Sequence, residues 1–232
     1  MNICIIPARG GSKRIPRKNI RLFCGKPMIS WSIAAAIESR CFDHIAVSTE
    51  DEEVAEIARL WGAVVPFKRP LELADDHSPT NVVIAHAIKW FVSQGQTPEN
   101  VCCLYATAPF ATGSDLRRGL SELETSECDY AFSVTSYPFP IQRAVRITKS
   151  CRVEMFNSEY SNTRSQDLEE AYHDAGQFYW GRSTAWQEKR QIFGLRSVPV
   201  TMPRYRVQDI DTHEDWVRAE WLFKAMQQEK HF

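Results

Sequence analysis

The residue types best suited to chemistry gather in a basic loop near the start of this chain. Seven lysine and arginine side chains, and no acidic residue, fall between Arg9 and Lys26. The loop also contains Gly10 and Gly11, whose backbone can approach a ligand closely. Arginine offers a planar fork of donors and lysine a compact charge, and both suit phosphate oxygens. Because the loop directly follows an apolar run at 2–8, we predict a polyanion-binding loop at the end of a strand.

A pair of carboxylates, Asp209 and Asp211, forms a second group near the other end of the chain. If this segment is extended, the two side chains share one face, with α-carbons roughly 7 Å apart. Two carboxylates at that spacing can hold Mg²⁺, which prefers oxygen ligands and shares its shell with substrate phosphates. The alternative is a turn that starts a helix, in which aspartate is also common.

Together, a cationic loop and an acidic pair predict nucleotidyl transfer. The cations would hold a leaving pyrophosphate while Mg²⁺ neutralises charge at the reacting phosphorus. Other nucleotide-binding motifs do not match. A Walker loop would need glycine and a hydroxyl residue where the chain has Ile20 and Pro27, and no G-x-G-x-x-G occurs at the first turn. P-loop hydrolases and dinucleotide oxidoreductases are therefore disfavoured.

Alternating strand and helix patterns must position these groups. In the first third of the chain we predict a helix that opens at Pro27, a strand at 44–49, a helix from Asp51 to Gly62 and a strand at 63–67. Further on we predict a helix capped by Thr80 and ending near 92, a strand at 101–107, and a helix capped by Ser114 or Asp115 and ending near 124.

The remaining predicted elements are strands at 129–135 and 177–180 and a final helix that starts with a capping box at Thr212. Regular alternation of this kind is typical of βαβ units. The predicted fold class is therefore α/β: a Rossmann-like, mostly parallel sheet flanked by helices. On the strand at 177–180, Gln177 and Tyr179 alternate with Phe178 and Trp180, so one pair should face the core and the other a cleft.

Composition narrows the class of protein further. The chain has 232 residues, 28 Lys+Arg against 29 Asp+Glu, and a formal net charge of −1. Its positive charge is local, so we expect no nucleic-acid partner. One domain spanning 1–232 is the natural expectation for this length. We expect no membrane segment and a cytoplasmic protein. The seven cysteines are odd in number without a C-x-x-C pair, which favours buried free thiols.

The pattern changes between Tyr137 and Asp174. Pro138 and Pro140 interrupt it, and two short apolar segments flank a turn at 149–150 before a polar stretch. A disordered loop is one interpretation. The apolar residues of the segment exceed what a solvated loop needs, so we favour an inserted β-rich arm that contacts another subunit.

Several motifs, in order along nearly the whole chain, resemble those of the CMP-sialic acid synthetase (acylneuraminate cytidylyltransferase) family. They are Ala8-Arg9-Gly10-Gly11-Ser12-Lys13 through Lys18-Asn19, Val47-Ser48-Thr49, Arg69-Pro70-x-Glu72-Leu73-Ala74, Thr107-Ala108-Pro109 and Asp209-Ile210-Asp211-Thr212. Within that family the chain resembles the pseudaminic acid cytidylyltransferases most closely, through segments 13–19, 105–110 and 174–180. Sialic acid synthetases usually carry a glutamine that contacts the sugar where this chain has Tyr105, which points to a different nine-carbon acid sugar.

The resemblance implies roles for individual residues. The implied contacts to CTP are Arg9, Gly11, Lys18, Asn19, Arg69 and Thr80. Asp209 and Asp211 would hold the catalytic Mg²⁺, with Arg9, Lys18 and Asp211 the catalytic residues. Tyr105 would contact the sugar, and Gln177 is a further candidate for a sugar contact because of its place in the alternation of the strand at 177–180. Relatives are homodimers whose arm closes the partner's sugar pocket, so Arg143 and Arg164 become candidates to pair with the sugar carboxylate.

The resemblance implies a Mg²⁺-dependent enzyme that joins CMP from CTP to the anomeric hydroxyl of a nonulosonic acid, with pseudaminic acid the preferred candidate, and releases pyrophosphate. Three alternatives remain open at this point. They are a synthetase for CMP-N-acetylneuraminate or CMP-legionaminate, a nucleotidyltransferase acting on a sugar 1-phosphate, and a CTP-binding regulatory subunit without catalysis.

Overall fold

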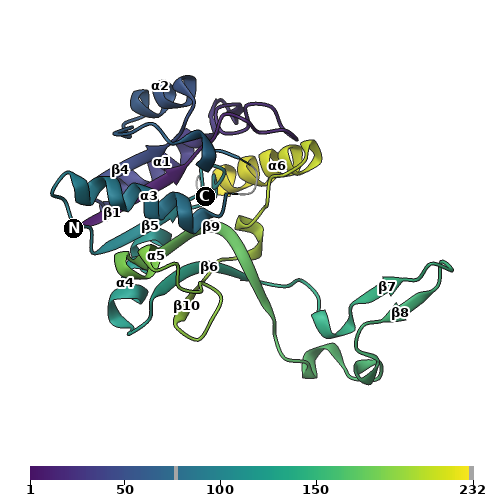
Figure 1. Cartoon of the computed structure of the whole chain (residues 1–232). Helices are drawn as coiled ribbons and strands as arrows, with labels where there is room; N and C mark the ends of the chain where they lie inside the picture. Colours follow the sequence, from purple (N-terminus) through teal and green to yellow (C-terminus); the bar gives the residue numbers. More distant parts are fainter. Residues whose placement is uncertain (76–77, 230–232) are drawn as a thin grey trace.

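The centre of the molecule is a six-stranded sheet, seen here in a computed structural model that describes residues 1–75 and 78–229. Its strands lie in the order β10-β6-β9-β5-β1-β4 (Figure 1). Their bounds are β1 Asn2–Pro7, β4 His44–Ser48, β5 Asn100–Leu104, β6 Tyr130–Ser136, β9 Tyr172–Arg182 and β10 Ser197–Thr201. All pairs are parallel except those of β9, which runs antiparallel to both β5 and β6. The predicted α/β class with a mostly parallel sheet is confirmed.

Helices cover both faces of this sheet. Their bounds are α1 Met28–Ser39, α2 Glu52–Leu60, α3 Thr80–Ser93, α4 Gly113–Thr125, α5 Ser183–Gln187 and α6 His213–Glu229. Alternate residues of β1 point into different cores: Cys4 and Ile6 pack with α1, α2 and α4, whereas Ile3 and Ile5 pack with α3 and α5. Complete burial of these side chains on both faces explains why the strand is an unbroken apolar run.

A third, smaller core fastens the basic loop and α6 to the body. Ile15 from the loop, Phe23 from β2 (Leu22–Phe23) and Ile210 from the acidic segment are buried together with Trp216 and Phe223 of α6. The ring of Phe23 packs edge-on against both α6 aromatic rings. Strand β2 pairs with β3 (Lys26–Pro27) in a short hairpin just before α1. The two chemically interesting segments, far apart in sequence, therefore share one core.

Three predicted details of the elements are wrong. Residues 63–67 form no strand: the segment touches the sheet only through bridges at Val64 and Lys68, because Pro66 between them has no N–H to donate. Thr80 does not cap α3; the N-cap position is Pro79, and Thr80 is the first helical residue. Helix α4 is capped by Thr112 in a capping box with Asp115, rather than by Ser114 or Asp115.

The capping box predicted for the last helix is confirmed. The Thr212 and Asp215 side chains each accept a hydrogen bond from the other residue's backbone N–H, at 3.2 and 2.8 Å. The cysteines are free thiols, as predicted, but only Cys4, Cys102 and Cys103 are buried, and Cys151 is exposed at a turn. Among the described residues, no helix has the length and apolar character that crossing a membrane would need.

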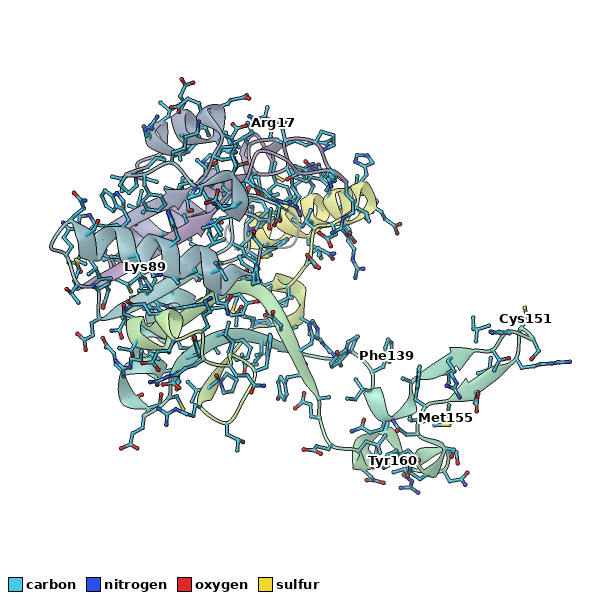
Figure 2. All side chains as sticks on the ribbon, viewed as in Figure 1. Arg17, Lys89, Phe139, Cys151, Met155 and Tyr160 are labelled. Atoms are coloured by element: carbon cyan, nitrogen blue, oxygen red, sulfur yellow. The ribbon has the colours of Figure 1, made fainter. Side chains whose placement is uncertain are left out.

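The segment between β6 and β9 leaves the body of the molecule and forms a projecting arm (Figure 1). Its regular parts are short 3-10 turns and a hairpin of β7 (Val145–Ile147) with β8 (Val153–Met155). Large apolar side chains are exposed on it, among them Phe139 at 79% and Ile147 at 78%. Figure 2 shows Cys151 at the far tip and Tyr160 and Met155 well away from the sheet.

Candidate active site

The basic loop follows β1 and is held by the elements beside it. The Glu50 carboxylate, just after β4, accepts the Gly10 N–H at 2.7 Å. Arg17 forms a two-armed ion pair with Asp51, the N-cap residue of α2, at 2.5 and 2.9 Å. A Cβ on Gly10 would lie 2.3 Å from the Asp51 carboxylate oxygen, so only glycine fits there. Arg17, one of the seven cations, therefore fixes the loop to α2.

A cavity of about 310 Å³ opens between this loop, α3 and the end of β5. It brings together five residues predicted to contact the nucleotide, namely Arg9, Lys18, Asn19, Arg69 and Thr80. Gly11, the sixth, is not part of the lining and faces open space. The Asn19 amide donates to the Arg9 carbonyl oxygen at 2.9 Å, which ties the two ends of the loop together. The result is a cationic pocket large enough for part of a nucleotide.

Arg69 is the most deeply placed cation of this cavity, with 4% of its surface exposed. Its Nε donates to the Ser48 hydroxyl at 3.0 Å and a terminal nitrogen to the Ser48 carbonyl oxygen. Burial lowers the pKa of Arg69 to about 10, and the Glu50 carboxylate opposes that shift. A group with this pKa remains protonated near neutral pH, so Arg69 is a fixed, preoriented positive charge.

Thr80 lines the first cavity, and its hydroxyl group lies within hydrogen-bonding distance of a second residue of the lining. Thr80 Oγ1 and the phenol oxygen of Tyr105, just beyond β5, lie 3.1 Å apart. Thr80 does not cap α3 because Pro79 occupies the N-cap position and Thr80 is already helical. Burial raises the pKa of Tyr105 to about 12, so its phenol stays neutral and can both donate and accept.

A second cavity of about 380 Å³ adjoins the first, since Tyr105 and Thr107 line both. Its other walls come from the first half of β9 and from the acidic segment, including Asp174, Tyr179 and Asp209. The Tyr179 phenol donates to the Asp174 carboxylate, which also accepts the Gly176 N–H at 2.8 Å. Burial raises the pKa of Tyr179 well above its ordinary value. Two neutral phenols and two carboxylates therefore surround this cavity.

The acidic pair lies beside the basic loop: Asp209 lines the second cavity, whereas Asp211 lines neither cavity and contacts Lys18. Ile210 between the carboxylates is buried, whereas Asp209 is exposed and Asp211 is partly exposed. Lys18 Nζ donates to the Ile210 carbonyl oxygen at 2.7 Å and lies 3.3 Å from Asp211, whose other oxygen pairs with Arg14 at 2.8 Å. Partial burial and the Asp211 charge raise the pKa of Asp209.

These carboxylates suit a divalent cation. Burial, and after it the Asp211 charge, raises the pKa of Asp209, and a bound cation would oppose both effects. The described residues contain no cluster of three or more histidine, cysteine or acidic ligands. A metal held by Asp209 and Asp211 would thus take its other ligands from phosphate oxygens and water, as Mg²⁺ commonly does.

The structure separates three predicted sugar-binding residues from both cavities. Gln177 has 3% of its surface exposed, and its amide donates to the Arg206 carbonyl oxygen at 2.6 Å instead of facing a cavity. The residue before Gln177, Gly176, has a backbone φ of +60°. Arg143 and Arg164 lie on the projecting arm, where Arg143 contacts Ser165 at 3.3 Å. Neither arginine lines either of these two cavities.

The sequence did not single out Glu50 or Asp174, and it left Tyr179 as either a core or a cleft residue. Glu50 had a usable signal, because it directly follows a predicted strand at the same sheet edge as the basic loop. Asp174 and Tyr179 had none, since their contact depends on how β9 pairs between β5 and β6.

This arrangement is that of a nucleotidyltransferase: cations and carboxylates meet at the carboxyl ends of parallel strands β1, β4 and β5. A solved structure with a TM-score of 0.68 has the same fold at 18% identity, covering 98% of this chain and 99% of its own; it is a CMP:2-keto-3-deoxy-manno-octonic acid synthetase complexed with CTP.

Comparison with known sequences defines the family. The cytidylyltransferase family model matches residues 3–229. A pseudaminic acid cytidylyltransferase of Campylobacter jejuni is 46% identical over 224 residues, 97% of each chain. N-acylneuraminate cytidylyltransferase A of Danio rerio is 32% identical, over 93% of this chain and 49% of its own. This chain belongs to the cytidylyltransferase family, and the resemblance seen in its motifs is confirmed.

Proposed function

We propose that this enzyme transfers CMP from CTP to the anomeric hydroxyl of pseudaminic acid and releases pyrophosphate. A bond forms between the anomeric oxygen and the α-phosphorus of CTP, the bond to the pyrophosphate oxygen breaks, and the hydroxyl proton leaves. The observation that carries this proposal is the pair of adjoining cavities. One is lined by cations, the other by phenols and carboxylates, and they share Tyr105 and Thr107.

In this proposal CTP occupies the cationic cavity. Arg9 and Lys18 bind its phosphates and stabilise the charge that develops on the leaving pyrophosphate. Asn19 lies beside the nucleoside, and the buried Arg69 and Thr80 line the cytidine side. Gly11 contributes only its backbone, since a side chain at this position would point into open space.

Asp209 and Asp211 hold the Mg²⁺ ion. When bound, the metal neutralises phosphate charge and helps to orient the reacting groups. The two carboxylates suit it because they are hard ligands that repel each other. Lys18 contacts both Ile210 and Asp211, so the same ammonium group links the metal-binding segment to the phosphate-binding loop.

The acceptor sugar occupies the second cavity. The choice of pseudaminic acid is supported by the 46% identity to the Campylobacter jejuni enzyme against 32% to the Danio rerio N-acylneuraminate enzyme. Tyr105 supports it too, because its phenol stands where sialic acid synthetases usually carry a glutamine. A cytoplasmic location is part of the proposal, since CTP is a cytoplasmic substrate.

We also propose that two chains complete each sugar site. Among the described residues, those that line the second cavity include the carboxylates Asp174 and Asp209 and no lysine or arginine, although the substrate is itself an acid. A homodimer in which the arm at 137–174 crosses onto the partner would supply Arg143 or Arg164 for the substrate carboxylate. The exposed apolar side chains of the arm are suited to such a contact.

The direct test is pyrophosphate release from CTP and Mg²⁺, measured in parallel with pseudaminic, legionaminic and N-acetylneuraminic acids and without sugar. We expect release with pseudaminic acid and none without an acceptor. Preference for N-acetylneuraminic or legionaminic acid would overturn the choice of sugar but keep the chemistry. No release with any acid, despite measurable CTP binding, would overturn the reaction itself.

A further inference from the structure

A buried ion pair lies just upstream of the acidic segment and has no part in the proposed reaction. The Arg206 guanidinium bonds to the Asp115 carboxylate on α4 and to the Phe110 carbonyl oxygen, the latter at 3.1 Å. The two side chains are 15% and 6% exposed. Gln177 of β9 holds the same residue from the other side, through its bond to the Arg206 carbonyl oxygen. We call these three residues the clasp.

The clasp acts on the segment that carries the acidic pair. Arg206 ends a 3-10 turn (Arg204–Arg206), and Asp209 follows three residues later. Downstream, the segment is fixed by the buried Ile210 and by the Asp215 carboxylate, which accepts the Asp211 and Thr212 N–H groups at 3.2 and 2.8 Å. Those bonds hold Asp211. Upstream of Asp209, the clasp attaches the segment at Arg206 to α4 and β9.

Stability alone does not explain this ion pair. In the described part of the chain, Arg206 Nε and Gln177 Oε1 are both buried without a hydrogen-bond partner. Buried ion pairs contribute little net stability even when fully bonded, and apolar side chains of similar volume often replace them without loss. A donor and an acceptor left unpaired weaken the case for stability further. What the clasp does supply is a fixed, directional link between α4, β9 and the acidic segment.

We propose that Arg206, Asp115 and Gln177 are positioning residues that set the place of Asp209 relative to Asp211. This inference rests on the proposed role of the two aspartates in holding the divalent cation. Gln177 was predicted from sequence to contact the sugar. In this proposal it instead acts indirectly, by holding the segment that carries Asp209. Asp115 serves twice, because its carboxylate also accepts the Thr112 N–H at 3.0 Å as part of the α4 capping box.

The test uses Mn²⁺ as the probe and measures its binding by electron paramagnetic resonance in the presence of a non-hydrolysable CTP analogue. Arg206→Met and Asp115→Asn each break the ion pair, and Asp115→Asn keeps an oxygen that can accept the capping bond. Gln177→Met removes only the bond to the Arg206 carbonyl and serves if the ion-pair variants fold poorly. We expect each variant to bind Mn²⁺ about tenfold more weakly, the loss typical of partners that orient metal ligands.

The chain offers a matched control in Asp129, a second buried aspartate paired with two arginines. It accepts from Arg190 at 2.8 Å and from Arg196 at 2.7 Å. Asp129 directly precedes β6. Because the other end of β6 leads into the arm, Asp129 lies at the end of the sheet opposite to the cavities. Asp129→Asn should lower the melting temperature without changing Mn²⁺ binding or the affinity for the CTP analogue.

The outcomes separate the two proposals. Unchanged Mn²⁺ binding in the three clasp variants, with only a lower melting temperature as in Asp129→Asn, would make the clasp merely structural and overturn the inference. If Asp209→Asn and Asp211→Asn also leave Mn²⁺ binding unchanged, the metal assignment itself fails, and the clasp fails with it. Weaker Mn²⁺ binding in the clasp variants, with no further loss when Arg206→Met and Asp115→Asn are combined, would support a single positioning unit.

Discussion

The phenol oxygen of Tyr105 lies 3.1 Å from the hydroxyl oxygen of Thr80, and this contact stands between the two cavities. Thr80 lines only the cationic cavity, whereas Tyr105 lines both. In the proposed complex, the acceptor sugar would therefore contact Tyr105 and the nucleotide would contact Thr80, the two members of one hydrogen-bonded pair.

Removal of the Tyr105 hydroxyl should act mainly on the sugar. We expect Tyr105→Phe to raise the KM for the acid sugar about tenfold, which corresponds to one hydrogen bond of about 1.4 kcal/mol. The KM for CTP should change much less. Steady-state kinetics with each substrate varied in turn is the measurement. Tyr130→Phe is the control, since that phenol donates to the distant Arg190 carbonyl at 3.3 Å. Equal increases in both KM values would contradict the assignment.

Loss of a metal-binding carboxylate should abolish turnover while nucleotide binding survives. For Asp211→Ala we expect kcat to fall about a thousandfold, because the bound metal contributes several kcal/mol to the transition state. Calorimetry with a CTP analogue in the absence of metal should still detect binding through Arg9, Lys18 and Arg69. A variant that retains more than about a tenth of wild-type kcat would argue against the metal role.

Cations of the basic loop should differ sharply in their importance. Lys18→Met removes a cavity-lining ammonium group, and we expect at least a tenfold loss of CTP affinity together with a lower kcat, since a charge-assisted bond is worth about 1.5–3 kcal/mol. Lys26→Met is the matched control: Lys26 belongs to the same basic stretch, but its ammonium group packs over the Trp31 ring, 4.8 Å from the centroid. Similar losses in both variants would point to general charge attraction instead.

Acid should remove the stability that Asp129 contributes. The bonds from Arg196 and Arg190 lower the pKa of Asp129 below its ordinary value of 3.8. Its contribution is therefore complete above that value and is lost as the pH falls through the lower, folded-state pKa. Asp129→Asn should reduce the free energy of unfolding by about 2 kcal/mol at pH 7. In urea titrations from pH 7 to 3, a difference that does not shrink at the acid end would contradict this account.

Charge placed on the arm should dissociate the proposed homodimer. Ile147, 78% exposed, faces Val153 across the β7–β8 hairpin. We expect Ile147→Asp to elute as a monomer in size-exclusion chromatography with light scattering, to bind the CTP analogue normally and to lose turnover. Leu60→Asp is the control, because Leu60 is 82% exposed on α2, away from the arm. A monomeric wild-type protein, or a dimer that survives the change, would refute the arm contact.

Local patterns were enough to predict five of the six strands of the sheet, most helices and the two charged segments, but they missed β10. Alternating apolar periods identify these elements, the basic loop follows β1, and the acidic segment lies just before α6. Thr80 was misplaced because its hydroxyl bonds to a residue 25 positions away instead of to its own helix. Gln177 was assigned to the sugar because period-two alternation does not reveal that the Arg206 carbonyl takes its amide. A local sequence pattern does not reveal such long-range hydrogen bonds.

The arm begins where β6 ends and returns where β9 begins, and these two points are neighbours: Ser136 pairs with Tyr172. The two ends of the arm thus join adjacent strands. At its base, the Tyr137 N–H donates to the Ala171 carbonyl oxygen at 2.9 Å. Residues can be added to or removed from this excursion without shifting the register of the sheet. Changes in the length of the arm therefore leave the strands and loops that line the nucleotide cavity in place, whereas in the proposed dimer they would alter the sugar site of the partner.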